Sequence, residues 1–92
     1  MLIVYAIITI DLPFASSLKG RRKIINSIKD RLKHHNMAVA DLSGEYPKEA
    51  ALALLFFAKS QNDANNKIAK IDELLAKYFG EVSYDIEYEI LS

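Results

Sequence analysis

The stretch Leu2-Ile3-Val4-Tyr5-Ala6-Ile7-Ile8-Thr9-Ile10 decides the predicted fold of this chain. It is rich in β-branched residues and apolar on both of its faces, which predicts a strand in the middle of a sheet. At about ten residues the apolar run is too short to cross a bilayer, which takes roughly twenty. No basic segment precedes it and no small-residue cleavage site follows it, unlike a signal peptide. We therefore expect a buried strand and no membrane association.

The middle of the chain alternates between helical and extended patterns. Leu18 to about His35 carries apolar residues on one arc at helical spacing, which predicts a helix, and Met37 to Leu42 reads as a short strand. Lys48 to Ala58 is again apolar on both faces. A buried helix would have the same composition, but the Tyr46-Pro47 start and the short turn before it favour a strand.

A second helix and an alternating strand complete the pattern. Ser60 or Asn62 caps this helix, and Gly80 ends it just past Phe79. The core stripe that we expect on it is Ala64, Ile68, Ile71, Leu75 and Tyr78. In the last strand, Val82, Tyr84, Ile86, Tyr88 and Ile90 alternate with Glu81, Ser83, Asp85, Glu87 and Glu89. One buried face and one wet, acidic face are typical of a strand at a sheet edge.

The order strand, helix, strand, strand, helix, strand predicts an α+β ferredoxin-like plait (βαββαβ), with a four-stranded antiparallel sheet and two helices on one face. Residues 1–92 would form one such domain. The first and third strands are central in this plait, in agreement with their two apolar faces. The open sheet face would then expose Ile3, Tyr5, Ile7, Leu55 and Phe57. Because such a patch usually marks an interface, we expect a homodimer through this face or through an edge strand.

Composition narrows the function classes. The 92 residues are 51% apolar and 26% charged, as in an ordinary soluble globular protein. The chain has no cysteine, which excludes disulfides, thiolate metal sites and thiol catalysis. The absence of cysteine is compatible with the reducing cytosol, so we expect a cytoplasmic protein.

The first helix begins with charges of an unexpected sign. Ser17 reads as the N-cap, and Lys19, Arg21, Arg22 and Lys23 follow it within two turns. The dipole of a helix N-terminus favours anions by roughly 0.3–1 kcal/mol each, so stability alone would place acids there. Residues 17–35 contain seven Lys or Arg and one acid, whereas the other seventy-three residues contain five basic and eleven acidic side chains. This concentration of positive charge in residues 17–35 predicts that an anionic partner binds at the start of the first helix.

The segment Ser17-Leu18-Lys19-Gly20-Arg21-Arg22-Lys23, continued by Ser27-Ile28-Lys29-Asp30-Arg31-Leu32, resembles the signature of the YlxP-type family of bacterial domains of unknown function. The apolar first strand, the Leu-Pro loop and the Val-Ala-rich second strand extend the resemblance over nearly the whole chain. It implies a ferredoxin-like plait. Family genes often lie among translation and ribosome-maturation genes, which implies a link to RNA or the ribosome but no activity.

The candidate phosphate-binding or RNA-binding residues are Lys19, Arg21, Arg22, Lys23, Lys29 and Lys33. All but Arg21 spread over an arc of about 120° that adjoins the apolar stripe. Such an arc could follow a phosphate backbone, or it could be only a solvated face. Arg21 falls within the apolar arc, so it either reaches out past the sheet edge or pairs with a carboxylate such as Asp11, Asp41 or one on the last strand.

Other signals are weaker. His34 and His35 point about 100° apart on a helix, which does not suit a metal site. Tyr5 and Phe56 or Phe57 lie where RNA-recognition plaits place stacking aromatics, but core or dimer packing is the simpler interpretation. The chain has no Gly-rich phosphate loop, no Ser/His/Asp arrangement and no metal cluster, so we expect no enzyme, cofactor or metal. The sequence predicts a non-catalytic RNA-associated or ribosome-associated binding protein; the alternative is a small dimeric regulatory or protein-interaction module with no nucleic-acid role.

Overall fold

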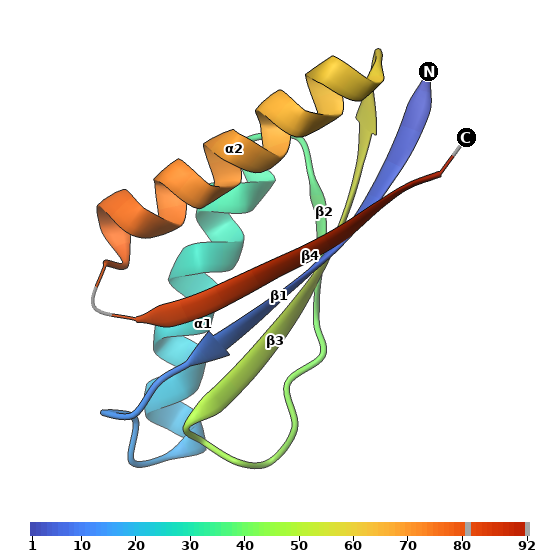
Figure 1. Cartoon of the computed structure of the whole chain (residues 1–92). Coiled ribbons are helices and arrows are strands. Elements are labelled where there is room, and N and C mark those ends of the chain that lie inside the picture. Colours follow the sequence, from blue (N-terminus) through green and yellow to red (C-terminus); the bar gives the residue numbers. More distant parts are fainter. Residues whose placement is uncertain (81, 92) are drawn as a thin grey trace.

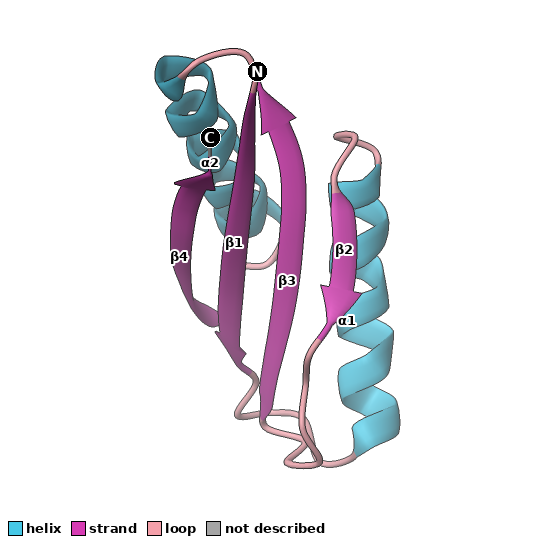
Figure 2. Cartoon of the chain, turned by 90° about the vertical axis from the view of Figure 1, so that its right-hand side faces the viewer, coloured by secondary structure: helices cyan, strands magenta, loops and turns pink. Residues whose placement is uncertain are grey.

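The computed structural model describes residues 1–80 and 82–91, and its elements follow the predicted order (Figure 1). They are β1 (Leu2–Asp11), α1 (Leu18–Lys33), β2 (Ala38–Asp41), β3 (Glu49–Ala58), α2 (Gln61–Tyr78) and β4 (Ser83–Leu91). The four strands form one antiparallel sheet in the order β2-β3-β1-β4, with both helices on one face (Figure 2). The fold is therefore the predicted α+β plait. Glu81, predicted on the polar side of the last strand, lies outside the described residues.

The ambiguous third segment is a strand. β3 pairs with β1 along its whole length, from Leu2 opposite Ala58 to Asp11 opposite Glu49. Alternate β3 residues from Ala50 to Ala58 are buried beneath the helices, and the residues between them lie on the open face. A strand uses both apolar sets in this way, one against the core and one on the outer surface.

The core lies between the sheet and the helices. Val4, Ala6, Ile8, Ile10 and Leu12 are fully buried on the first strand and just beyond it. The helices contribute Ile25, Ile28 and Leu32 from α1, and Ala64, Ile71 and Leu75 from α2. In the described part of the chain no polar or charged side chain is buried. The core is thus wholly apolar, and the described polar and charged side chains lie at or near the surface.

Two tyrosines attach the edge strand β4 to α2. The Tyr84 hydroxyl donates to Oδ1 of Asp72 at 2.7 Å, and the Tyr88 hydroxyl donates to Oδ1 of Asn65 at 3.0 Å. The hydrogen bond to Asp72, together with partial burial and the carboxylate charge, raises the pKa of Tyr84 to about 12. The apolar set of β4 therefore faces the helices, as its alternation predicts.

The ends of α2 are set by a serine and a glycine. Ser60 rather than Asn62 is the N-cap, and its Oγ accepts from the Asp63 N–H at 3.1 Å. Gly80 follows the C-cap Phe79, as predicted, but it does not have a positive φ. A Cβ at Gly80 would lie 2.9 Å from the carbonyl oxygen of Ala76. Glycine is therefore needed here for a close backbone approach.

Tyr78 does not belong to the core stripe, contrary to prediction. It is the last residue of α2 and is 48% exposed. The guanidinium carbon of Arg31 lies 3.8 Å from the centroid of its ring. Helical spacing places this side chain on the apolar side, but at the helix end the ring meets α1 instead of the sheet. A tyrosine suits such a site because its hydroxyl can remain in water.

Candidate nucleic-acid interface on the first helix

α1 presents a row of cations to solvent. Ile25, Ile28 and Leu32 are buried against the core, so the opposite side of the helix faces solvent. Lys19, Arg22, Lys23 and Lys33 are exposed, whereas Arg21 and Lys29 are partly buried. We call the four exposed residues the basic face of α1. Across residues 1–80 and 82–91 the one ion pair within 4.0 Å is Lys67–Asp63, so no described carboxylate neutralises this face at that distance.

The two helix N-termini differ in charge. Ser17 is the N-cap of α1, and its Oγ accepts from the Gly20 N–H at 3.1 Å, but the first turn contains no acid. The first turn of α2 contains Asp63, which accepts from the Lys59 N–H at 2.8 Å. That hydrogen bond lowers the pKa of Asp63. α2 thus carries its own anion at the positive end of its dipole, and α1 does not.

Arg21 is held by the loop before β3. Its Nη1 donates to the Tyr46 carbonyl at 2.8 Å and to the Glu49 carbonyl at 3.1 Å. The acceptors are backbone carbonyls rather than the carboxylates expected from sequence, because the loop before β3 lies within reach of the buried arc of α1. This contact gives Arg21 a structural role, and phosphate binding by Arg21 stays a prediction.

The charge of Lys29 acts on Asp41, the last residue of the edge strand β2. Partial burial alone would raise the pKa of Asp41, but hydrogen bonding from Ser43, whose N–H lies 2.9 Å from Oδ1, outweighs it. The charges of Lys29 and Arg21 lower the pKa of Asp41 further. The six predicted cations therefore fall into two groups: Lys29 and Arg21 interact with the protein itself, and the four residues of the basic face are turned to solvent.

The open side of the sheet brings the five predicted interface residues together. Tyr5 pairs with Leu55 and Ile3 pairs with Phe57 across β1 and β3, and Phe57 is 61% exposed. Ile7, one pleat further along β1, is partly buried. Figure 2 views the sheet from this side, with both helices behind it. The prediction correctly grouped these residues on one uncovered face.

Carboxylates border this apolar patch. Opposite β1, the β4 residues Asp85, Glu87 and Glu89 pair with Thr9, Ile7 and Tyr5. Asp11 and Glu49, which pair at the far end of the sheet, fall on the same face by strand alternation. The strand residues that share this face include no lysine or arginine. The open face would therefore repel phosphate, and an anionic polymer would approach the helical side.

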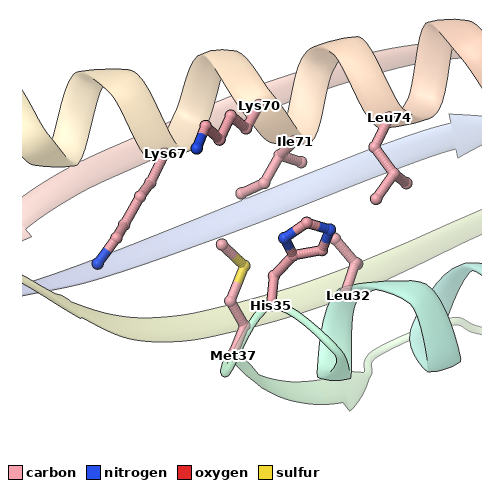
Figure 3. Close-up of a pocket in the computed structure, with 7 residues that line it drawn as sticks. All are labelled: Leu32, His35, Met37, Lys67, Lys70, Ile71 and Leu74. Carbon is pink, nitrogen blue, oxygen red and sulfur yellow. The ribbon is translucent and has the colours of Figure 1, made fainter.

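A small cavity of about 110 Å³ lies between the end of α1 and the middle of α2 (Figure 3). Leu32, Met37 and Ile71 line it, together with His35. Lys67 at its rim donates to the Phe57 carbonyl at 2.9 Å. Within the described residues no three His, Cys, Asp or Glu side chains are grouped to hold a metal ion. The cavity is an apolar gap beside the core rather than a site with its own chemistry.

A larger groove lies at the other end of the helix pair and was not predicted. It has a volume of about 580 Å³ and is bordered by Phe14, Lys23 and Ile24 on one side and by Tyr78 and Phe79 on the other. Sequence reasoning placed Tyr78 in the core and gave Phe14 no role. The available signal was Phe14 itself, an aromatic residue next to Pro13 in a loop, where the core does not require one.

Comparisons with known proteins identify the family. A family model described as "Protein of unknown function (DUF503)" matches residues 3–88. The chain belongs to the DUF503 family. No curated protein matches the chain. This DUF503 plait is similar to a solved structure titled "De novo designed protein Foldit4", with 11% identity, 97% coverage of both chains and a TM-score of 0.58. That likeness concerns the fold alone.

None of the described helices of this DUF503 chain has both the length and the apolar character needed to cross a membrane.

Proposed function

We propose that this protein is a non-catalytic RNA-binding protein that contacts the phosphate backbone through the basic face of α1, in ribosome maturation or translation. One observation carries the proposal. Lys19, Arg22, Lys23 and Lys33 lie on one solvent-exposed helix face, and no described carboxylate lies within 4.0 Å of them. Cations that are not used within the fold are free to bind an external anion.

The dimensions of α1 suit this role. Sixteen helical residues extend about 24 Å. A nucleic-acid strand in a duplex carries one phosphate per about 3.4 Å of axis, so the helix can lie along several phosphates. The acidic open face lies on the other side of the sheet, which gives a molecule of zero net charge a strong polarity. This polarity would orient the protein on RNA with α1 inward.

The resemblance of the α1 signature to YlxP-type domains also supports the proposal. Genes of that family often lie among those for translation and ribosome maturation, which favours RNA as the polyanion. Lysine and arginine read phosphate whatever its source, so the geometry of α1 alone would also accept another polyanion.

A salt series tests the proposal. Fluorescence anisotropy on labelled ribosomal RNA fragments should show affinity that falls steeply with salt, with a log–log slope of about −0.7 to −0.9 per phosphate contact. The combined variant Lys19→Gln, Arg22→Gln and Lys33→Gln should flatten this slope by about two to three units. These three side chains are exposed, so stability should change little.

Lys59→Gln with Lys70→Gln is the control for a general loss of positive charge, because it removes two exposed cations from outside α1. This control should leave most of the slope in place. Equal and weak binding of the wild-type protein and the α1 variant at low salt would overturn the proposal.

The open sheet face supports a second candidate function, that of a small dimeric interaction module. Tyr5, Leu55 and Phe57 form an exposed apolar patch without a covering helix. A second copy of the chain could cover this patch, and this would leave α1 accessible to RNA. The two functions are therefore compatible, and the oligomeric state tests the second one separately.

A further inference from the structure

We infer that the groove between α1 and the C-terminal end of α2 binds an unpaired base of RNA, so that the protein prefers looped or single-stranded RNA to duplex. This inference rests on the proposed function and adds a preference for one form of RNA. It places base recognition between the helices, away from the sheet.

The groove has the size and lining for a nucleobase. Its volume of about 580 Å³ lies within the range of ordinary small-molecule sites. Phe14, 54% exposed, borders it from the loop before α1, and Tyr78, 48% exposed, borders it from the end of α2. Ile24 and Phe79 supply further apolar surface. Exposed aromatic rings beside apolar walls are the surfaces on which unpaired bases stack.

Cations surround the aromatic ring of Tyr78. The guanidinium carbon of Arg31 lies 3.8 Å from the ring centroid, and Nζ of Lys77 lies 5.1 Å from it. At this distance the guanidinium covers one face of the ring, so a base would stack on the other face; almost half of the tyrosine stays open to solvent. An aromatic platform with adjoining positive charge combines base stacking with attraction for the backbone.

The groove is continuous with the basic face of α1. Lys23 belongs to both, since it lies on the exposed side of the helix and also lines the groove. The described lining residues include Lys23 and Lys77 but no carboxylate. An RNA strand bound along α1 would thus bring its bases to the mouth of the groove.

The helix dipoles set the orientation of the bound nucleotide. Lys23 lies near the positive N-terminal end of α1, which favours phosphate, whereas Tyr78 and Phe79 lie at the negative C-terminal end of α2. The phosphate should therefore lie toward Lys23 and the base toward Tyr78. Carbonyl oxygens at the end of α2 could accept from exocyclic amino groups of the base.

The sheet offers no comparable site. Its exposed aromatics Tyr5 and Phe57 share a face with Asp85, Glu87 and Glu89, and none of the strand residues on that face is basic. A nucleotide stacked there would bring its phosphate close to like charge. The helical groove is the place where aromatic and positive groups coincide.

Paired RNA probes test the inference. We would measure anisotropy for a labelled hairpin with an unpaired loop and for a blunt duplex with the same number of phosphates. The wild-type protein should bind the hairpin more tightly. Phe14→Ser and Tyr78→Ser should each weaken hairpin binding by about five- to hundredfold and leave duplex binding within about twofold, because only the hairpin offers an unpaired base. Phe14→Tyr should retain the preference.

Phe57→Ser is the control, since it removes an aromatic from the open face that is at least as exposed as Phe14 and Tyr78. It should leave the hairpin preference unchanged. The chain has no tryptophan, so Phe14→Trp adds a single tryptophan that can be excited apart from the five tyrosines, and we expect its emission to be quenched by hairpin but not by duplex.

Equal binding of hairpin and duplex, with no effect of Phe14→Ser or Tyr78→Ser, would overturn the inference. If that equal binding still weakened with salt, the proposed function would stand. Loss of salt-dependent binding to both probes would overturn the proposed function and the inference together.

Discussion

Arg31 and Tyr78 join the two helices at their outer surface, with the guanidinium carbon 3.8 Å from the ring centroid. Arg31 is one of the seven cations in residues 17–35, and it contacts the protein itself. Among the described residues, the four of the basic face of α1 make no such contact and stay exposed. The contact also places an exposed aromatic ring beside that face. The same ring borders the groove between the helices.

We expect Arg31→Gln to lower the free energy of unfolding by about 0.5–1 kcal/mol, the range of an exposed cation–π contact. Urea denaturation would measure the change. A double-mutant cycle with Tyr78→Leu isolates the contact, since the loss at Arg31 should shrink once the ring is absent. Additive losses at the two positions would show that the contact contributes nothing.

Arg21→Gln should destabilise the protein by about 1–2 kcal/mol, because the two charged hydrogen bonds to the carbonyls of Tyr46 and Glu49 are lost from a partly exposed site. Thermal unfolding followed by circular dichroism would show the lower midpoint. Arg22→Gln, one residue away but exposed, should stay within about 0.5 kcal/mol of the wild-type protein. Equal effects of the two substitutions would contradict the structural role of Arg21.

Tyr84→Phe should lower the free energy of unfolding by about 1 kcal/mol at neutral pH, because the hydroxyl loses its bond to Asp72. The folded state raises the pKa of Tyr84 to about 12, whereas an unfolded tyrosine titrates near 10. The stabilisation is therefore fully present below pH 10 and is lost as pH rises from about 10 to 12. Urea curves for the wild-type protein and the variant should converge over that window. A constant difference up to pH 12 would contradict the assignment.

We predict a homodimer through the open sheet face, and sedimentation at high micromolar concentration would detect it. A two-fold axis parallel to the strands would lay each β4 over the partner's β2, since these strands are the opposite edges of the sheet. The acidic rows would then lie at the two rims of the interface. Added salt should strengthen the dimer by screening the carboxylates.

Phe57→Ser should dissociate this dimer, and Phe14→Ser, which removes an exposed aromatic from another surface, should not. A monomer at every concentration and salt would rule out this use of the open face.

Local pattern predicted the type of each element of the plait except the third strand, whose composition also fits a buried helix and which was assigned from the turn before it. The apolar stretch Leu2–Ile10 predicted a central strand, the alternation from Val82 predicted an edge strand, and Ser17 and Gly80 marked helix ends. These features depend on the spacing of residues along one element, and the periods of two and 3.6 residues are visible in a sequence. The basic segment after Ser17 was equally visible, since charge composition is a local property.

Contacts between elements came only from the tertiary structure. The sequence placed Tyr78 in the core and left Arg21 either to reach past the sheet edge or to pair with a carboxylate. Packing at the end of α2 placed Tyr78 against Arg31 instead, and the path of the loop before β3 gave Arg21 two backbone carbonyls as partners. Strand register likewise set Glu87 beside Ile7 and so made the apolar patch acidic at its border. Pairings of this kind depend on how far one element slides or tilts against another, and no periodicity within a single element specifies that displacement.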